Sequence, residues 1–165
     1  MRLSKLEGKT VIGLTGAQKL GKVDDAFSDS YAGKIVGLKI TGLQDGTELV
    51  TSIEHVKSIG PDAVIVDSKD SLEAAGAASN VANLISLKSL LNNRVVTEGG
   101  QVLGTLYDVE IDPRTHQIVD YHYDGGPLGE IFHRGHILQP KDVIGSGPGL
   151  VTVSSSAATP PTKAA

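Results

Sequence analysis

Short runs in which apolar and polar residues alternate dominate this chain, and they predict β-strands rather than helices. The clearest run covers residues 102–111, VLGTLYDVEI, and residues 117–123, QIVDYHY, follow it as an expected partner strand. At a period of two, one face of the first run carries four of its apolar side chains: Leu103, Tyr107, Val109 and Ile111. The pattern therefore predicts an antiparallel hairpin.

Turn residues bound these strands. Asp112 suits the first position of a turn and Pro113 presets the φ angle of the second, while the Gly-Gly pair in 98–101 suits a second hairpin turn. Gly104 lies inside a strand, which predicts a sharp bend or a close backbone approach. Further strands are expected at 130–138 and 149–153.

The same pattern occurs twice. Residues 20–40 align without gaps on 103–123, and further matches follow in the same order at nearby offsets. Identical pairs in the ungapped stretch are Leu20/Leu103, Gly21/Gly104, Asp25/Asp108, Asp29/Asp112, Ile35/Ile118 and Val36/Val119. The repeat predicts two modules, module one at 1–67 and module two at 84–153.

The two modules are expected to form small all-β barrels that pack on each other or exchange an edge strand, since closure or pairing removes exposed strand edges. The central strand of module one is less regular, because Phe27 aligns with Glu110. A bulge and a contact with module two would both explain this irregularity.

The remaining segments carry weaker patterns. Residues 68–83 are expected to form a linker with a short helix that starts after Ser71, since serine favours helix N-caps and an alanine-rich stretch follows. Residues 154–165 are small, polar and proline-containing, and we expect them to be disordered.

Composition narrows the function classes. The net charge of −4 and the aromatic content of 4% count against direct nucleic-acid binding. Without cysteine the chain has no disulfide, thiolate nucleophile or cysteine metal site. We expect no membrane span and no secretory signal, and hence a cytoplasmic protein.

The order of these segments resembles the PRC-barrel family. The resemblance rests on the Leu-Gly-x-hydrophobic-x-Asp-hydrophobic stretch at 103–109, the hairpin at 112–119 and the Gly-Pro pairs that precede β-branched strands. These barrels are named after the cytoplasmic domain of the photosynthetic reaction-centre H subunit and are also found in the ribosome maturation factor RimM. The resemblance implies two tandem barrels that dock on other macromolecules, with no family catalytic residues or cofactor to carry over.

Three histidines are the candidate metal ligands: His122, His133 and His136. A transition-metal site needs three or four converging ligands, and residues three apart in an extended strand point to opposite faces. We therefore expect surface histidines and no metal site, with Gly135 as the one feature that could bend the chain enough to bring two of them together.

Tyr121 and Tyr123 share one face of their strand. They are either packed inward or against the other module, or they form an exposed aromatic patch for a protein partner. Asp25 and Asp108 occupy equivalent places, which favours structural hydrogen bonding or a solvated strand edge over an acid–base pair. The glycine-rich stretches at 13–21 and 124–130 lack the features of a phosphate loop and are expected to be turns.

The sequence favours a non-catalytic interaction or adaptor protein that docks on a protein partner or an assembly complex. One alternative is an RNA-linked role in ribosome maturation similar to that of RimM, and another is a metal or small-ligand sensor. A homo-oligomer is compatible with the sequence.

Overall fold

The computed structural model describes residues 1–77, 83–125, 135–158 and 162–163. Its first half contains the helix α1 (Leu3–Leu6) and strands β1 (Thr10–Gly13), β2 (Gln18–Ser28), β3 (Ile35–Gly42), β4 (Glu48–Ser52), β5 (Val56–Ile59), β6 (Ala63–Val66) and β7 (Glu73–Ala74). The second half contains strands β8 (Ile85–Ser86), β9 (Arg94–Thr97), β10 (Val102–Ile111), β11 (Ile118–Gly125), β12 (Gly135–Leu138), β13 (Val143–Gly147), β14 (Leu150–Val153) and β15 (Thr162–Lys163). Short 3₁₀ turns lie at Ile53–His55, Lys69–Ser71, Ala75–Ala77, Lys88–Leu90, Pro140–Asp142 and Ser155–Ala158.

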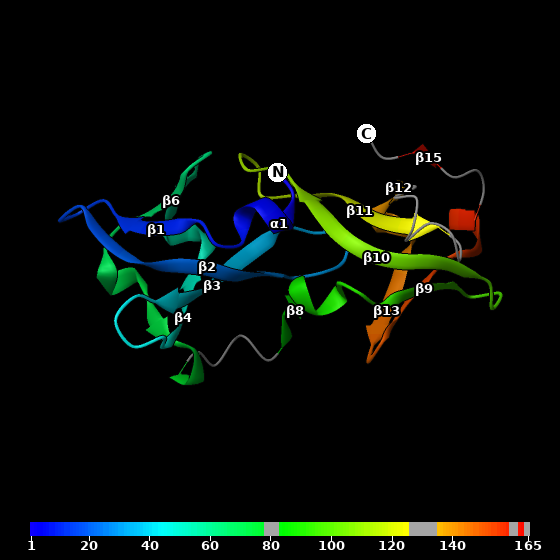
Figure 1. Ribbon diagram of the computed structural model, residues 1–165, viewed down its shortest axis with the longest axis horizontal. Helices are drawn as coiled ribbons and strands as arrows, with labels where there is room; N and C mark the ends of the chain where they lie inside the picture. Colours follow the sequence, from blue (N-terminus) through cyan, green and yellow to red (C-terminus); the bar gives the residue numbers. More distant parts are fainter. Residues whose placement is uncertain (78–82, 126–134, 159–161, 164–165) are drawn as a thin grey trace.

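The two sheets share one strand order, with β8 as an additional strand that pairs with β2 in the first sheet, and this confirms the predicted all-β fold of two tandem barrels. The first runs in the order β5-β6-β1-β2-β3-β4-β7 and the second in the order β13-β14-β9-β10-β11-β12-β15. In each sheet the first and last long strands of the module pair in parallel, β1 with β6 and β9 with β14. Figure 1 shows the two sheets side by side along the long axis of the molecule.

The predicted turn chemistry is confirmed in the β10–β11 hairpin. Asp112 Oδ1 accepts hydrogen bonds from the backbone N–H groups of Arg114 (2.8 Å) and Thr115 (3.2 Å), and His116 closes the turn in the left-handed region at φ 66°. The close approach expected at Gly104 is also present. A Cβ on Gly104 would lie 1.7 Å from the Asp124 carbonyl oxygen, so the strands meet this closely only because glycine is there.

Bulges change the face that each central strand buries. The register of β10 against β11 shifts between Leu106 and Asp108, which inserts Tyr107 as an extra residue. Leu106, Val109 and Ile111 are buried as a result, whereas Tyr107 is only partly buried. The prediction is therefore wrong for Tyr107, since a bulge reverses the alternation, whereas Leu103 is partly buried and packs against the core that contains Val109 and Ile111.

The irregular central strand of module one has both of the causes that the sequence left open. β2 has the corresponding register shift between Val23 and Asp25, and its last residues pair with β8, which lies at the start of module two. Phe27 thus lies opposite Ser86 in a strand pair that joins the two halves of the chain.

The linker differs from its prediction. Ser68, and not Ser71, caps the first turn: the Ser68 hydroxyl accepts from the Asp70 N–H, and Ser71 supplies the reciprocal contact to the Ser68 N–H. The described residues of the linker form 3₁₀ turns and the two-residue strand β7 instead of an α-helix. Pairing of β7 with the edge of β4 outweighs the helix propensity of the alanines, because it supplies partners to a strand edge.

Chain order continues beyond the boundary that composition predicted at residue 154. Ser155–Ala158 form a 3₁₀ turn, Ala157 packs on the core, and the Ser155 N–H donates to Glu98 Oε1 at 3.2 Å. β15 then pairs with the edge of β12, as β7 pairs with β4. Both sheets therefore end in a short strand supplied by the segment that follows the module.

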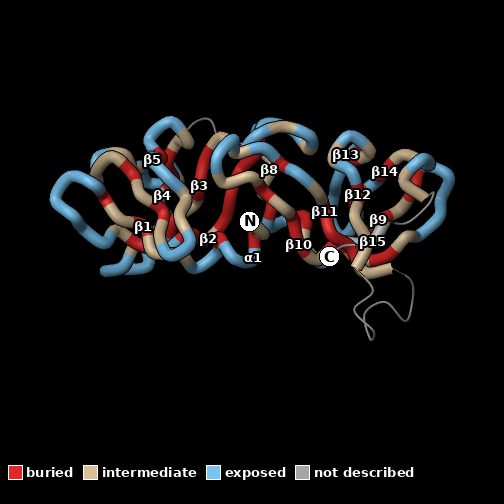
Figure 2. The backbone as a smooth tube through the Cα atoms, turned by 90° about the horizontal axis from the view of Figure 1, so that it is seen from above, coloured by how far each residue is buried: buried red, intermediate tan, exposed pale blue. Residues whose placement is uncertain are grey.

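One continuous hydrophobic core runs through both barrels. Leu3 and Leu6 from α1, together with Leu87 and Leu90, are almost fully buried at the centre of the molecule. Figure 2 shows these buried segments meeting between the two barrels, near the N-terminus. Apolar side chains of both modules are consequently buried in one core. Because apolar burial is the dominant stabilising term in folding, the two modules stabilise each other.

Candidate functional site

The contact between the modules obeys an approximate two-fold symmetry. The Ile35 N–H donates to the His116 carbonyl (2.8 Å), and the equivalent Ile118 N–H donates to the Gly33 carbonyl (3.0 Å). At the centre, Lys34 forms an isolated bridge with Gln117, the residue that matches it in the repeat. Reciprocal contact of equivalent residues is the geometry of an isologous dimer, here formed within one chain.

The modules also exchange their first turns. Arg2 bridges to Glu110 in module two, and Ser86 pairs with Phe27 in module one, where Phe27 and Glu110 are equivalent. The turn that begins each module therefore packs on the central strand of the other module. This confirms that the barrels both pack together and exchange edge segments.

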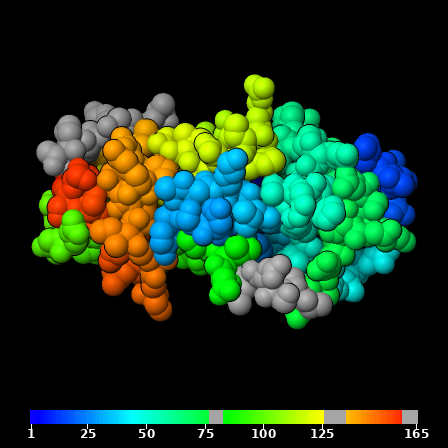
Figure 3. Space-filling view, turned by 180° about the vertical axis from the view of Figure 1, so that it is seen from behind, coloured from blue at the N-terminus to red at the C-terminus, as the bar shows by residue number. Residues whose placement is uncertain are grey.

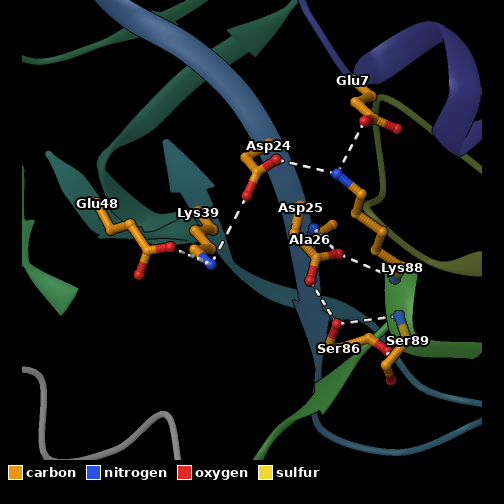
Figure 4. A network of polar contacts seen from close by, with 9 residues as sticks. All are labelled: Glu7, Asp24, Asp25, Ala26, Lys39, Glu48, Ser86, Lys88 and Ser89. Carbon is orange, nitrogen blue, oxygen red and sulfur yellow. Dashed lines mark hydrogen bonds and ion pairs between the residues drawn. The ribbon is translucent and has the colours of Figure 1, made fainter. Parts of the chain in front are cut away.

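Asp25 and Asp108 fasten the exchanged turns. Asp25 accepts from the Lys88 N–H (3.0 Å) and the Ser86 hydroxyl, as Figure 4 shows, and also from the Ala26 N–H (2.7 Å). Asp108 accepts from the N–H (3.2 Å) and hydroxyl of Ser4 and from the Val109 N–H (2.9 Å). Both carboxylates are buried and satisfied by hydrogen bonds, so the structural interpretation of this aspartate pair is confirmed.

A charged network surrounds the first of these contacts (Figure 4). Lys88 binds Glu7 (2.9 Å) and Asp24 (3.0 Å), and Lys39 binds Glu48 (3.0 Å) and Asp24 (3.7 Å). The hydrogen bond that Lys39 donates to Glu48 is the main reason that its pKa is raised, and the hydrogen bond that Lys88 donates to Glu7 is the main reason that the pKa of Lys88 is raised. Through Asp24, the network links Lys39 of module one to Lys88 of module two.

The tyrosines predicted as candidates for a partner surface are buried. Tyr121 is 0% exposed and its hydroxyl donates to the Tyr31 carbonyl of module one (2.6 Å), while Tyr123 is 4% exposed. Burial raises the pKa of both phenols. The structure therefore confirms inward packing and not the alternative of an exposed patch at Tyr121 and Tyr123, and at Tyr121 this packing includes the other module.

Tyr31 is the tyrosine that the sequence reasoning missed. It lies in the β2–β3 connection, and its hydroxyl is 2.8 Å from that of Ser146 in module two. In Figure 3 the light-blue segment around residue 30 reaches the orange segment of module two. Because Tyr31 lies in a loop, outside any alternating pattern, the sequence did not indicate this contact.

The candidate histidines do not form a common site in the described structure. His122 pairs with Ile137 and Tyr123 pairs with His136, so His122 and His136 point to opposite faces of the sheet. His133 lies outside the described residues. Among the residues that the structure describes, no group of three or more potential metal ligands comes together.

His122 and His136 instead pack against aromatic rings. The ring of His122 meets Tyr107 edge to face at 6.0 Å, and His136 stacks on Tyr123 at 5.3 Å. Nδ1 of each ring is buried without a hydrogen-bond partner among the described residues. Burial lowers the pKa of His122, because the charged form loses its hydration.

A groove of about 540 Å³ opens on module one, beside the module boundary. Its apolar side is formed by Phe27, Val36 and Val50 around Gly37. Its polar side carries carboxylates from three separate segments, namely Asp29 after β2, Glu54 in the turn after β4 and Glu73 in β7. The groove is therefore a concave surface that combines apolar contacts with three carboxylates.

This groove has a different lining at the equivalent place in module two. Glu110 replaces Phe27 and binds the N-terminal ammonium group of Met1 at 3.2 Å. Lys141 stands in the Pro140–Asp142 turn that corresponds to the turn carrying Glu54.

A second hollow of about 530 Å³ on module one has a mixed lining that includes Lys19, Asp45 and Lys69.

The PRC-barrel domain model matches residues 1–73 and 82–158. The chain therefore belongs to the PRC-barrel family and contains two tandem copies of its domain. A comparison with curated proteins finds no match. Within the described residues, no helix combines the length and the apolar character that a membrane crossing requires.

Proposed function

We propose that this protein is a non-catalytic adaptor whose paired barrels form a rigid platform for a protein partner or an assembly complex. The observation that carries the proposal is the shared core with its reciprocal fastening at Asp25 and Asp108. It joins two small barrels into one body, and a rigid body loses little conformational freedom when a partner docks on it.

The roles of the polar side chains support this proposal. The aspartates that the repeat places in both modules hold the module boundary, and Lys88 of module two forms ion pairs across it with Glu7 and Asp24 of module one. The open groove beside that boundary leaves a concave surface for docking. Fold alone does not assign a function, so the proposal rests on this distribution of contacts.

Affinity capture tests the proposal. The tagged full-length protein is used to capture partners from a lysate of the cells in which it is naturally made, with and without nuclease, followed by mass spectrometry. We expect one protein or complex to be enriched in both samples and to bind the purified protein directly. Ribosomal components that disappear after nuclease treatment would instead favour the RNA-linked role, and direct binding to no enriched protein would contradict the adaptor.

A further inference from the structure

We infer that the groove on module one binds an extended, basic segment of the partner protein, in which an aliphatic residue is adjacent to a lysine or arginine. This inference rests on the proposed function and specifies the chemistry of the partner. It is carried by the lining of the groove and by the contrast with module two.

The apolar side of the groove suits an aliphatic side chain. Phe27 and Val50 are less than 10% exposed and present only part of their surface, and Val36 extends the same side. Gly37 lies opposite Phe27 in the strand pair and adds no side chain, which leaves the ring face accessible from the groove. A volume of about 540 Å³ is within the ~300–1,000 Å³ typical of ligand pockets.

The polar side of the groove suits a cation. Asp29, Glu54 and Glu73 line it, all three are exposed, and no lysine or arginine is among the described lining residues. The neighbouring His55 is 3.3 Å from Asp67, so its ring is already engaged by another carboxylate. Three like charges at one mouth are complementary to a basic partner and repel an acidic one.

The carboxylates retain the capacity to accept further hydrogen bonds. Asp29 uses Oδ1 for the Lys34 N–H (3.1 Å) and for the Ser30 hydroxyl, and Glu54 uses Oε1 for the Ser52 hydroxyl (3.1 Å). Each carboxylate has a second oxygen that takes part in none of these bonds. These contacts hold the two side chains in place without neutralising their charge.

A lysine or arginine next to an aliphatic residue uses both sides of the groove at once. Its methylene stem can lie along apolar surface while its charged end remains at the hydrated rim, which is a common arrangement for these long side chains. The aliphatic neighbour then fills the apolar side beside Phe27 and Val50. A purely charged ligand or a purely apolar one would use only half of the lining.

Module two supplies the natural contrast. Glu110 stands in place of Phe27, and Lys141 stands in place of Glu54. The same backbone thus carries an apolar wall with acidic edges in one module only. The inference therefore assigns the site to module one, and Glu54→Lys places there the residue that the fold already accepts in module two.

A peptide-binding measurement tests the inference. The probe is a fluorescein-labelled peptide with two leucines alternating with three lysines, titrated with the full-length protein and followed by fluorescence anisotropy. We expect saturable binding that weakens as salt rises, since the interaction involves exposed charges. Glu54→Lys should weaken binding by about tenfold, because it removes an attractive charge and adds a repulsive one.

Matched controls separate local from general effects. Asp62→Lys makes the same change of charge in the β5–β6 turn, outside the groove, and should alter the affinity by less than about twofold. A peptide with serines in place of the leucines should bind at least about tenfold more weakly than the probe. Circular dichroism of Glu54→Lys checks that the fold is retained.

Several results would overturn the inference. These are no detectable binding of the probe, equal binding by wild type and a folded Glu54→Lys variant, equal effects of Glu54→Lys and Asp62→Lys, and equal binding of the serine peptide. If the natural partner from the capture experiment still binds Glu54→Lys as tightly as wild type, the groove assignment fails and the adaptor function stands. If capture yields no direct partner, the adaptor function itself fails.

Discussion

The two modules have one backbone plan but different side chains at a matched central position. In module one Lys39 pairs with Asp25 across the strands and binds Asp24 and Glu48. In module two His122 takes the place of Lys39 and packs against Tyr107, the residue at the bulge that corresponds to Asp24. The same bulge therefore holds a charged network in one barrel and an uncharged aromatic contact in the other.

This difference separates what the fold requires from what each barrel can vary. Gly21 and Gly104, and Asp25 and Asp108, are identical in the two modules because strand crossing and the exchanged turns depend on them. The pairs Lys39/His122 and Phe27/Glu110 differ, and each is stabilised by its own neighbours. Predictions can therefore be directed at the matched pairs.

The largest effect is expected for the paired glycines. In Gly104→Ala the new Cβ would lie 1.7 Å from the Asp124 carbonyl oxygen, and in Gly21→Ala it would lie 2.3 Å from the Thr41 carbonyl oxygen. Both backbones must move, so each variant should lose about 3 kcal/mol or more of unfolding free energy. Denaturant unfolding measures this, with Gly46→Ala in an open turn as a control for positive φ alone. A Gly104→Ala variant as stable as wild type would contradict the close approach.

The fastening aspartates should show similar effects in the two modules. Asp25→Ala and Asp108→Ala each remove a buried carboxylate that accepts three hydrogen bonds, and each should cost about 2–3 kcal/mol. Denaturant midpoints measure the effect, and Asp62→Ala in an exposed turn serves as the control. If only one of the two variants lost stability, the two exchanged turns would not contribute equally to the free energy of unfolding.

A smaller effect is expected for the tyrosine that crosses the boundary. Tyr121→Phe removes the hydrogen bond to the Tyr31 carbonyl and should lower the unfolding free energy by about 1 kcal/mol. Tyr123→Phe is the matched control, since none of the described hydrogen bonds involves its hydroxyl. Equal losses in the two variants, measured by thermal or denaturant unfolding, would remove the inter-module bond as the cause.

The smallest effect is a pH dependence that belongs to module two. Burial lowers the pKa of His122 below its ordinary value of 6.5, so the unfolded chain binds the proton before the folded protein does. Stability should be full above about pH 6.5 and decline as the pH falls from there toward the folded pKa of the histidine. Unfolding at several pH values measures this decline.

His122→Phe should flatten that pH profile, because it removes the buried titrating ring. Burial also lowers the pKa of His116, which acts in the same direction, and His116→Asn tests its share because asparagine tolerates the left-handed turn at φ 66°. No counterpart is expected in module one, where Lys39 has a raised pKa and stays charged across this range. An unchanged slope in His122→Phe would place the pH dependence elsewhere.

The sequence by itself determined the local structure and the repeat. The strand pattern and the Asp112 turn depend on residues that are neighbours along the chain, so the spacing of residues reveals them. Gly104 marks one close approach of two strands, and a glycine inside a strand indicates such an approach. The equivalence of Asp25 and Asp108 also indicated a structural role, because a repeat places the same supporting residue twice.

Only the tertiary structure decided which faces and segments meet. The bulge at Tyr107 reversed the alternation, the linker formed β7 to cover the edge of β4, and the turn that begins each module packed on the other barrel. Tyr121 is buried in a contact between the modules, where its hydroxyl donates a hydrogen bond to the Tyr31 carbonyl. The groove likewise combines β2, the turn after β4, and the linker. These features depend on contacts between residues far apart in the chain, whose burial and hydrogen bonding outweigh local preference.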